Sequence, residues 1–204
     1  MPRHFVGPKL VVATHNRGKA EEIHQLLQAF DVTVVSAAEL GLSAPEETGA
    51  TFEDNARLKA RTAARETGLP ALADDSGLCV AALDGQPGVV TADWEGPTRD
   101  AMVGMARIQR ELAARRVPDT PDARRATFVC VLALAWPDGH CEMVRGEMPG
   151  HIVWPPRGTG GHGYDPTFQP DGSALTCAEL DPEAKNAISH RGAAFRKLID
   201  SYFR

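Results

Sequence analysis

ATFVCVLALAW, residues 126–136, is the strongest strand pattern in this 204-residue chain, and the fold can be worked out in both directions from it. A Pro-Asp-Gly turn at 137–139 separates it from a second strand pattern at 141–147, which predicts a hairpin. Towards the N-terminus, apolar runs at 10–13, 32–35 and 71–73 alternate with helical spacing at 19–29 and 51–66. This alternation predicts an α/β fold with a central mixed sheet flanked by helices.

Two further helices are expected nearer the C-terminus. Residues 99–116 are amphipathic, and one apolar stripe is formed by Met102, Met105, Ile108 and Leu112. Residues 189–203 close the chain as a helix. The polar segment 118–124 is the one candidate linker, and its length fits a connection inside a domain, so residues 1–204 are predicted to form a single domain.

Composition excludes several classes of function. A formal net charge of −5 argues against binding a nucleic-acid polymer, which favours a basic surface. No apolar run approaches the roughly 20 residues that span a bilayer, and residues 1–8 lack a signal-peptide core, so we expect a cytoplasmic protein that binds no membrane. The four cysteines are too scattered to predict a disulfide framework or a zinc site.

The first segment that carries chemistry is Thr14-His15-Asn16-Arg17-Gly18-Lys19. It joins a strand to a helix, so its backbone N–H groups and the lysine favour a phosphate group. The spacing does not match a P-loop. A solvated turn without a ligand is an equally good interpretation of this segment alone.

The second segment is Asp74-Asp75-Ser76-Gly77, interpreted as following the end of a strand. Two adjacent carboxylates there cannot both point into a core, and they raise each other's pKa unless a cation lies beside them. Mg²⁺ would meet this need, since it binds a few carboxylates together with phosphate oxygens and waters. Glu46 and Glu47 offer a further acidic group from a loop. A solvated turn is the alternative.

Two more segments lie towards the C-terminus. Residues 158–166 are rich in glycine and end in His162-Gly163-Tyr164-Asp165-Pro166, which suits close approach to a flat ligand. No βαβ unit follows them, so a dinucleotide-binding motif is rejected. The other of these C-terminal segments is residues 185–192. There Ser189 is a plausible helix N-cap that places His190 and Arg191 in the first turn, where cations oppose the helix dipole.

Together these segments resemble the inosine triphosphate pyrophosphatase family, whose members hydrolyse non-standard purine nucleoside triphosphates. The likeness runs from Lys9 to about Phe195. It rests on five motifs in the family's order: Thr-x-Asn-x-x-Lys, Glu-Glu-Thr-Gly-x-Thr-Phe-x-x-Asn-Ala, Ala-Asp-Asp-Ser-Gly-Leu, Gly-x-Gly-Tyr-Asp-Pro and Ile-Ser-His-Arg.

The resemblance implies an elongated fold of two lobes with the substrate in a cleft between them, and a homodimer. It implies hydrolysis of dITP, ITP and XTP to the monophosphate and pyrophosphate, with Mg²⁺ as cofactor. The residues implied for the triphosphate are Thr14, Asn16, Lys19 and Lys59, within the phosphate loop that also holds His15, Arg17 and Gly18. The metal is implied to be held by Glu47 and Asp75, together with Glu46. Asp75, supported by Asp74, is implied as the base that activates water. Ser76 contacts the substrate, and the base and sugar pocket is lined by His162, Gly163, Tyr164, Asp165, Lys185, His190 and Arg191.

Three positions depart from the family pattern. His15 replaces the usual Gly, His162 replaces the commoner Phe, and Asp93 stands where Arg is common. Two alternative functions remain open from the residues: a pyrophosphatase for modified pyrimidine nucleotides, and a nucleotide-binding protein without catalysis.

Overall fold

The computed structural model describes residues 3–14, 17–28 and 30–203. Over these residues six strands form one sheet in the order β2-β1-β3-β4-β5-β6. The strands are β1 Lys9–Val12, β2 Thr33–Ser36, β3 Ala71–Val80, β4 Arg125–Ala135, β5 Cys141–Ile152 and β6 Phe168–Pro170. β1 pairs in parallel with β2 and β3, whereas β5 and β6 are antiparallel, so the predicted mixed α/β sheet is confirmed.

The helices are α1 Arg17–Leu27, α2 Phe52–Thr67, α3 Ala101–Ala114, α4 Pro182–Ile188 and α5 His190–Tyr202, with 3-10 turns at Ala81–Leu83, Gly88–Glu95 and Asp165–Thr167. Sequence reasoning missed β6 and α4, because both are short and lie next to segments rich in loop-forming residues. None of the described helices is both long and apolar enough to cross a membrane.

Contacts divide the chain into two compact units. The first comprises Met1–Asp75, Cys130–Gly146 and Ala194–Arg204, and the second comprises Ser76–Val129 and Glu147–Ala193. The strands β3, β4 and β5 and the helix α5 each pass from one unit into the other along the chain.

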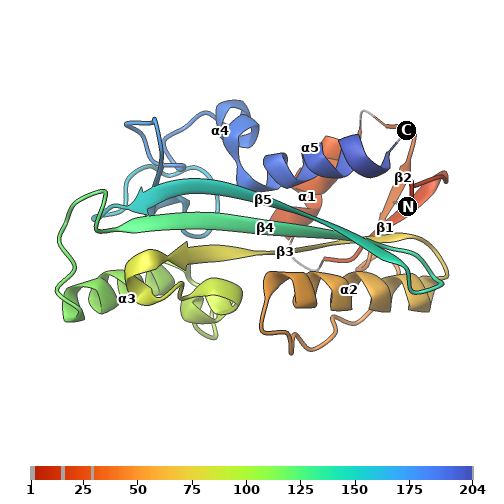
Figure 1. Cartoon of the computed structure of the whole chain (residues 1–204), viewed down its shortest axis with the longest axis horizontal. Coiled ribbons are helices and arrows are strands. Elements are labelled where there is room, and N and C mark those ends of the chain that lie inside the picture. Colours follow the sequence, from red (N-terminus) through yellow and green to blue (C-terminus); the bar gives the residue numbers. More distant parts are fainter. Residues whose placement is uncertain (1–2, 15–16, 29, 204) are drawn as a thin grey trace. The chain divides into compact units, whose positions relative to one another are not determined.

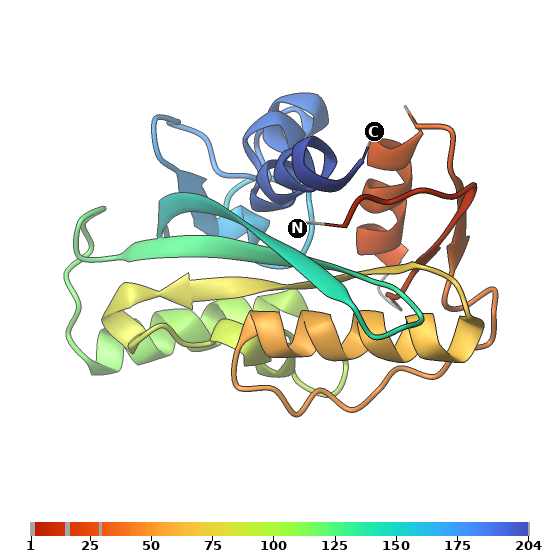
Figure 2. The same cartoon turned by 45° about the vertical axis from the view of Figure 1, so that its right-hand side comes forward.

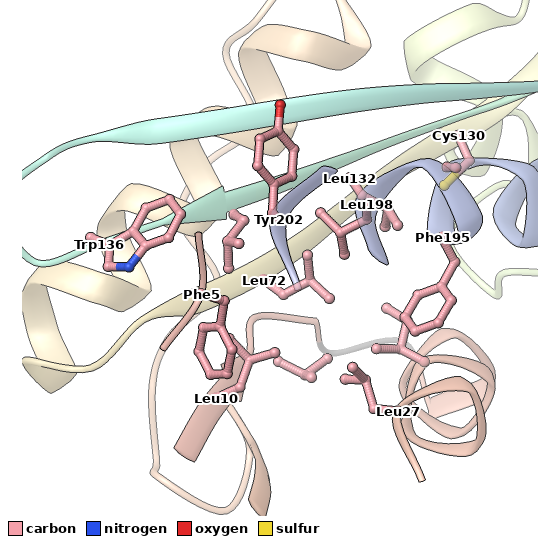
Figure 3. Close-up of a cluster of buried hydrophobic side chains, with 14 residues drawn as sticks. Phe5, Leu10, Leu27, Leu72, Cys130, Leu132, Trp136, Phe195, Leu198 and Tyr202 are labelled. Carbon is pink, nitrogen blue, oxygen red and sulfur yellow. The ribbon is translucent and has the colours of Figure 1, made fainter. Parts of the chain in front are cut away.

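The first unit has helices on both faces of its strands. Figure 1 shows α2 along one face and α1 and α5 on the opposite face, and Figure 2 shows the same arrangement after rotation. Its core is drawn in Figure 3, where Phe195, Leu198 and Tyr202 of α5 point into a cluster that also contains Leu72 and Leu132. Because helices lie on both faces, side chains on either face of β3 can be buried, including the carboxylates of this strand.

The second unit has its own core. α3 contributes Met105, Ile108 and Leu112, and the loop after β5 contributes Tyr164. The predicted apolar stripe of this helix is wrong at Met102, which is 50% exposed. Met102 lies in the first turn of α3, two residues after the N-cap Asp100.

The helix ends follow the sequence signals. Thr51 caps α2 by accepting a hydrogen bond from the Asp54 N–H at 3.1 Å, and threonine is a preferred residue at this position. Gly68 ends α2 in the left-handed conformation, with φ of 68°. Ser189 accepts from the Gly192 N–H at 2.9 Å, which confirms its role as the N-cap of α5.

Candidate active site

The adjacent carboxylates Asp74 and Asp75 lie in the middle of β3, not at a strand end. The expected break at 74–77 does not occur, because the strand continues to Val80. The expectation that both side chains cannot be buried is also wrong: Asp74 is 1% and Asp75 5% exposed. Successive side chains of a strand point to opposite faces, so the two carboxylates enter different surroundings. Each has its own lysine.

Asp74 pairs with Lys19 of α1. Its Oδ1 atom lies 2.6 Å from Lys19 Nζ, and its side chain is completely buried. The Cys130 thiol of β4 donates to Asp74 Oδ2 at 3.0 Å. A buried carboxylate with a cation and a hydrogen-bond donor is compensated for the loss of water. The lysine of the predicted phosphate segment is therefore held in place by the buried carboxylate.

The rest of that phosphate segment is described only in part. Thr14 is buried two residues after the end of β1. His15 and Asn16 lie outside the described residues. Arg17 and Gly18 begin α1, and the side chain of Arg17 is outside the described part of the chain. The predicted phosphate roles of these residues stay predictions.

Asp75 pairs with Lys59 of α2. Lys59 Nζ donates to Asp75 Oδ1 at 2.6 Å and to Glu47 Oε1 at 3.0 Å, so one ammonium bridges two carboxylates. The side chains of Lys59 and Asp75 are only 12% and 7% exposed, whereas Glu47 is 45% exposed. Glu46 is exposed and has no hydrogen bond or ion pair among the described residues. Of the two candidate glutamates, Glu47 is the one that the fold brings to Asp75.

Burial and charge act in opposite directions on this pair. Burial raises the pKa of the Asp75 carboxyl above its ordinary value, while the ammonium groups of Lys59 and Lys19 oppose this shift. Burial lowers the pKa of Lys59, but the carboxylates of Asp75 and Glu47 outweigh it and the net pKa is raised. Lys59 therefore stays charged, and Asp75 is a stronger proton acceptor than an ordinary aspartate.

The second oxygen of Asp75 fits a divalent cation. Asp75 Oδ2 is buried and accepts no hydrogen bond from any described residue. A buried carboxylate oxygen without a donor needs a cation or water. No three His, Cys, Asp or Glu side chains among the described residues form a ready metal site. Mg²⁺ nevertheless fits Asp75 and Glu47, because it commonly takes one or two carboxylates and completes its shell with phosphate oxygens and waters.

A second group of polar side chains lies in the second unit. Arg191, in the first turn of α5, donates to the Ser76 hydroxyl at 3.2 Å. Arg191 is 8% exposed. His190 beside it stacks on Phe128, with ring centroids 5.0 Å apart. The cationic helix start that looked unfavourable in the sequence is therefore packed against partners within the unit.

Asp165 organises the glycine-rich segment. It accepts from Lys185 Nζ and from the His162 N–H, both at 2.6 Å. Lys185 is 12% exposed at its side chain, and His162 is exposed. Gly161 approaches the Asp165 carboxylate so closely that a Cβ atom would clash with it. These contacts bring together His162, Asp165 and Lys185, with Gly163 between the first two.

Tyr164 occupies a different position from its neighbours. Its ring is 2% exposed in the core of the second unit, and its hydroxyl donates to the Thr91 carbonyl at 2.9 Å. Burial raises its pKa above the ordinary tyrosine value, so the hydroxyl stays protonated. The ring therefore anchors the glycine-rich segment to the core of the second unit. That Tyr164 lines a base pocket stays a prediction.

The model of the Ham1 family matches residues 10–201 of this chain. The chain belongs to the Ham1 family. The match covers both units and all the residue groups above.

Close relatives agree with this membership. The dITP/XTP pyrophosphatase of Rhodospirillum centenum is 58% identical over 99% of this chain and 98% of its own length. The enzyme of the same name from Gluconobacter oxydans is 54% identical over 96% of this chain and 91% of its own. The solved structure of a HAM1 protein from Coxiella burnetii has a TM-score of 0.87 and 40% identity, and the match covers 94% of this chain and 96% of that one. The resemblance inferred from the five motifs is confirmed.

Sequence reasoning did not assign roles to several side chains that shape this Ham1 site. No sequence motif marks Cys130, yet its thiol donates to Asp74. Asn55 was quoted in a motif without a role, yet its side chain holds the loop that carries Glu47. Thr91 receives the Tyr164 hydroxyl on its carbonyl, and no local pattern marks it. All three act across long sequence separations or on backbone atoms.

Proposed function

We propose that this chain hydrolyses dITP, ITP and XTP to the nucleoside monophosphate and pyrophosphate, and so removes these nucleotides from the cellular pool. One observation carries the chemistry. Asp75 is buried, one of its oxygens is held by Lys59, and the other accepts no hydrogen bond from the described residues. Relatives at 54–58% identity are named dITP/XTP pyrophosphatase.

The charged groups of the first unit would bind and activate the phosphates. Lys19 and Lys59 each present an ammonium already oriented by a carboxylate, and oriented charges are what phosphoryl transfer requires. Asp75, whose carboxyl pKa is raised by burial, takes the proton of the attacking water. A positioned general base contributes about 10²- to 10⁴-fold to the rate.

Asp75 and Glu47 would hold Mg²⁺, which when bound neutralises negative charge on the triphosphate. Binding of this cation would satisfy Asp75 Oδ2, and Glu47 is exposed enough to turn towards it. Glu46, which is exposed and has no hydrogen bond or ion pair among the described residues, is not needed in this proposal.

The groups of the second unit would recognise the purine. Hypoxanthine and xanthine carry an oxygen at position 6, which a donor such as Lys185 or His190 can meet. Lys185 uses one of its donors on Asp165, and an ammonium has three. Adenine would leave that donor unpaired, at a cost of about 1–3 kcal/mol. Ser76 and Arg191 form the remaining polar pair of this unit.

The decisive experiment measures pyrophosphate release from dITP, XTP, dGTP, dATP and dUTP, with Mg²⁺ and with EDTA. We expect turnover of dITP and XTP that EDTA abolishes. Turnover of dUTP in place of the purines would indicate a pyrimidine pyrophosphatase. Binding of dITP without turnover would indicate a nucleotide-binding protein, and either result would refute the proposal.

We also propose, as the family resemblance implies, that the chain acts as a homodimer in the cytoplasm. Sedimentation velocity on the purified protein tests the first part. A single species of the 21.9 kDa monomer mass across the concentration range would contradict it.

A further inference from the structure

The loop at residues 43–50 carries Glu47 but contains no helix or strand. Within the described chain, two side-chain interactions hold this loop to α2. Lys59 Nζ donates to Glu47 Oε1 at 3.0 Å, and the Gly49 N–H donates to Asn55 Oδ1 at 2.8 Å. A loop without regular secondary structure depends strongly on each of these two interactions for its position.

Asn55 is an unusual residue for its place. It is 2% exposed in the first part of α2, where a buried polar side chain is costly unless it is hydrogen-bonded. Its side-chain oxygen accepts the Gly49 N–H. The buried amide thus exchanges its hydration for a hydrogen bond to the partly buried loop backbone.

Gly49 is required at its position by space. A Cβ atom there would lie 2.5 Å from Asn55 Oδ1 and 2.7 Å from Asp54 Cβ. Real side chains essentially never approach so closely, so any other residue forces the loop away from α2. The close approach of backbone to helix is what makes the hydrogen bond possible.

Asn55 and Lys59 are four residues apart in α2 and therefore lie on the same helical face. The loop runs along this face, with Gly49 on Asn55 and Glu47 on Lys59. Two residues of extended chain span at most about 7 Å, so anchoring Gly49 restricts Glu47 to the neighbourhood of Lys59.

We propose that Asn55 and Gly49 form a latch that positions the Glu47 carboxylate beside Lys59 and Asp75, in the place where it serves as a metal ligand. Asn55 is a positioning residue, since it acts through Glu47. This inference rests on the proposed function for the role of Glu47, and it extends that function to two residues outside the set of phosphate, metal and base contacts.

The test compares Asn55→Ala and Gly49→Ala with the wild-type protein in three measurements. The first is hydrogen exchange of residues 43–50 in the nucleotide-free protein, which we expect to accelerate about fivefold, the factor that a typical hydrogen bond corresponds to. The second is the affinity for Mn²⁺ alone, followed by the loss of the free-ion electron paramagnetic resonance signal. The third is the Mg²⁺ activation constant at saturating dITP. Loss of a residue that positions a metal ligand should lower the affinity for Mn²⁺ and raise the Mg²⁺ activation constant, each by about 10-fold or more.

The pattern of the kinetic effects separates positioning from general damage. We expect kcat at saturating Mg²⁺ to stay within about threefold of wild type, because Asp75 and the lysines remain in place. Asn55→Asp keeps an acceptor oxygen for Gly49 and should restore the Mg²⁺ constant. In a Glu47→Gln background, Asn55→Ala should cause no further change in the Mg²⁺ activation constant.

Thr67→Ala is the matched control. Thr67 accepts the Leu69 N–H at the other end of α2, so this variant removes a bond of the same kind away from the loop. It should change neither the exchange of residues 43–50 nor either metal constant.

Unchanged exchange in Asn55→Ala would overturn the latch. Faster exchange with unaltered Mn²⁺ and Mg²⁺ constants would overturn its positioning role. A wild-type protein that turns over none of the nucleotides would refute the proposed function instead, and the Mn²⁺ measurement would then decide the latch alone. Absence of Mn²⁺ binding in that protein would overturn the latch as well.

Discussion

At the scale of single residues, the neighbouring carboxylates of β3 have separate tasks because the strand sends them to opposite faces. Asp74 is completely buried and serves as an anchor for Lys19, with Cys130 as its second partner. Asp75 keeps one oxygen free of hydrogen bonds from the described residues. Only the second of these carboxylates is available to accept a proton or a cation.

We therefore predict that Asp75→Asn lowers kcat for dITP by about 10²- to 10⁴-fold while the far-UV circular dichroism spectrum is retained. The amide has the same shape as the carboxylate but cannot act as a base. Steady-state pyrophosphate release measures the effect. Asp84→Asn, at an exposed carboxylate paired with Arg115, is the matched control and should keep wild-type turnover. Equal activity of the two variants would remove Asp75 from the mechanism.

At the scale of elements, α2 carries both Lys59 and Asn55, so the start of this helix matters for the site. Thr51 caps it through its side-chain oxygen. We predict that Thr51→Ala lowers the free energy of unfolding by about 1 kcal/mol, because one N-terminal N–H loses its acceptor. Chemical denaturation measures this. A variant as stable as wild type would show that the cap is replaced by water at no cost.

The strand β5 contains a histidine whose titration should affect stability. Burial lowers the pKa of His151, with smaller contributions from Arg125 and Arg157, while Asp171 opposes the shift. A pKa lower in the folded state than in the unfolded state means that the unfolded chain takes up the proton first as pH falls. Stability linked to His151 is therefore present above the unfolded pKa of about 6.5 and is lost as pH falls through the folded pKa.

We predict that wild type loses more stability than His151→Gln when the pH is lowered from 7.5 to 5.5. Guanidinium denaturation of both proteins at the two pH values measures the difference. Identical losses would show that this histidine titrates alike in the folded and unfolded chains.

At the scale of the whole molecule, the chain passes between the two units through β3, β4, β5 and α5. If one of these strands lost its hydrogen bonds in one unit, the part of the same strand in the other unit would lose its neighbouring support. We predict one cooperative unfolding transition in calorimetry. Leu198→Ala in the core of the first unit and Phe168→Ala in the second should each lower that single Tm, by roughly 2–4 °C per kcal/mol lost.

Two resolved transitions, with each substitution moving only one of them, would contradict this prediction. The two residues are suitable probes because both are completely buried. Removal of such side chains costs about 2–5 kcal/mol, which is large enough to separate the two outcomes.

Several features of this protein were determined by the sequence alone. Local patterns predicted β1, β2, β4 and the hairpin to β5, because period and turn chemistry act over a few residues. They also predicted the N-cap Ser189. The five motifs identified the family, because their combination of residue types is distinctive even when the positions of these residues in space are unknown.

Tertiary structure alone decided which residues meet. Nothing local shows that Asp74 and Asp75 sit inside a continuous strand, because the burial of both depends on helices folded over the two faces of β3. The choice of Glu47 over Glu46, the thiol of Cys130 on Asp74 and the hold of Asn55 on Gly49 likewise depend on packing. Spacing along a chain reports periodicity and turns, whereas the partner of a buried polar group is set by whatever the fold places within about 3 Å of it.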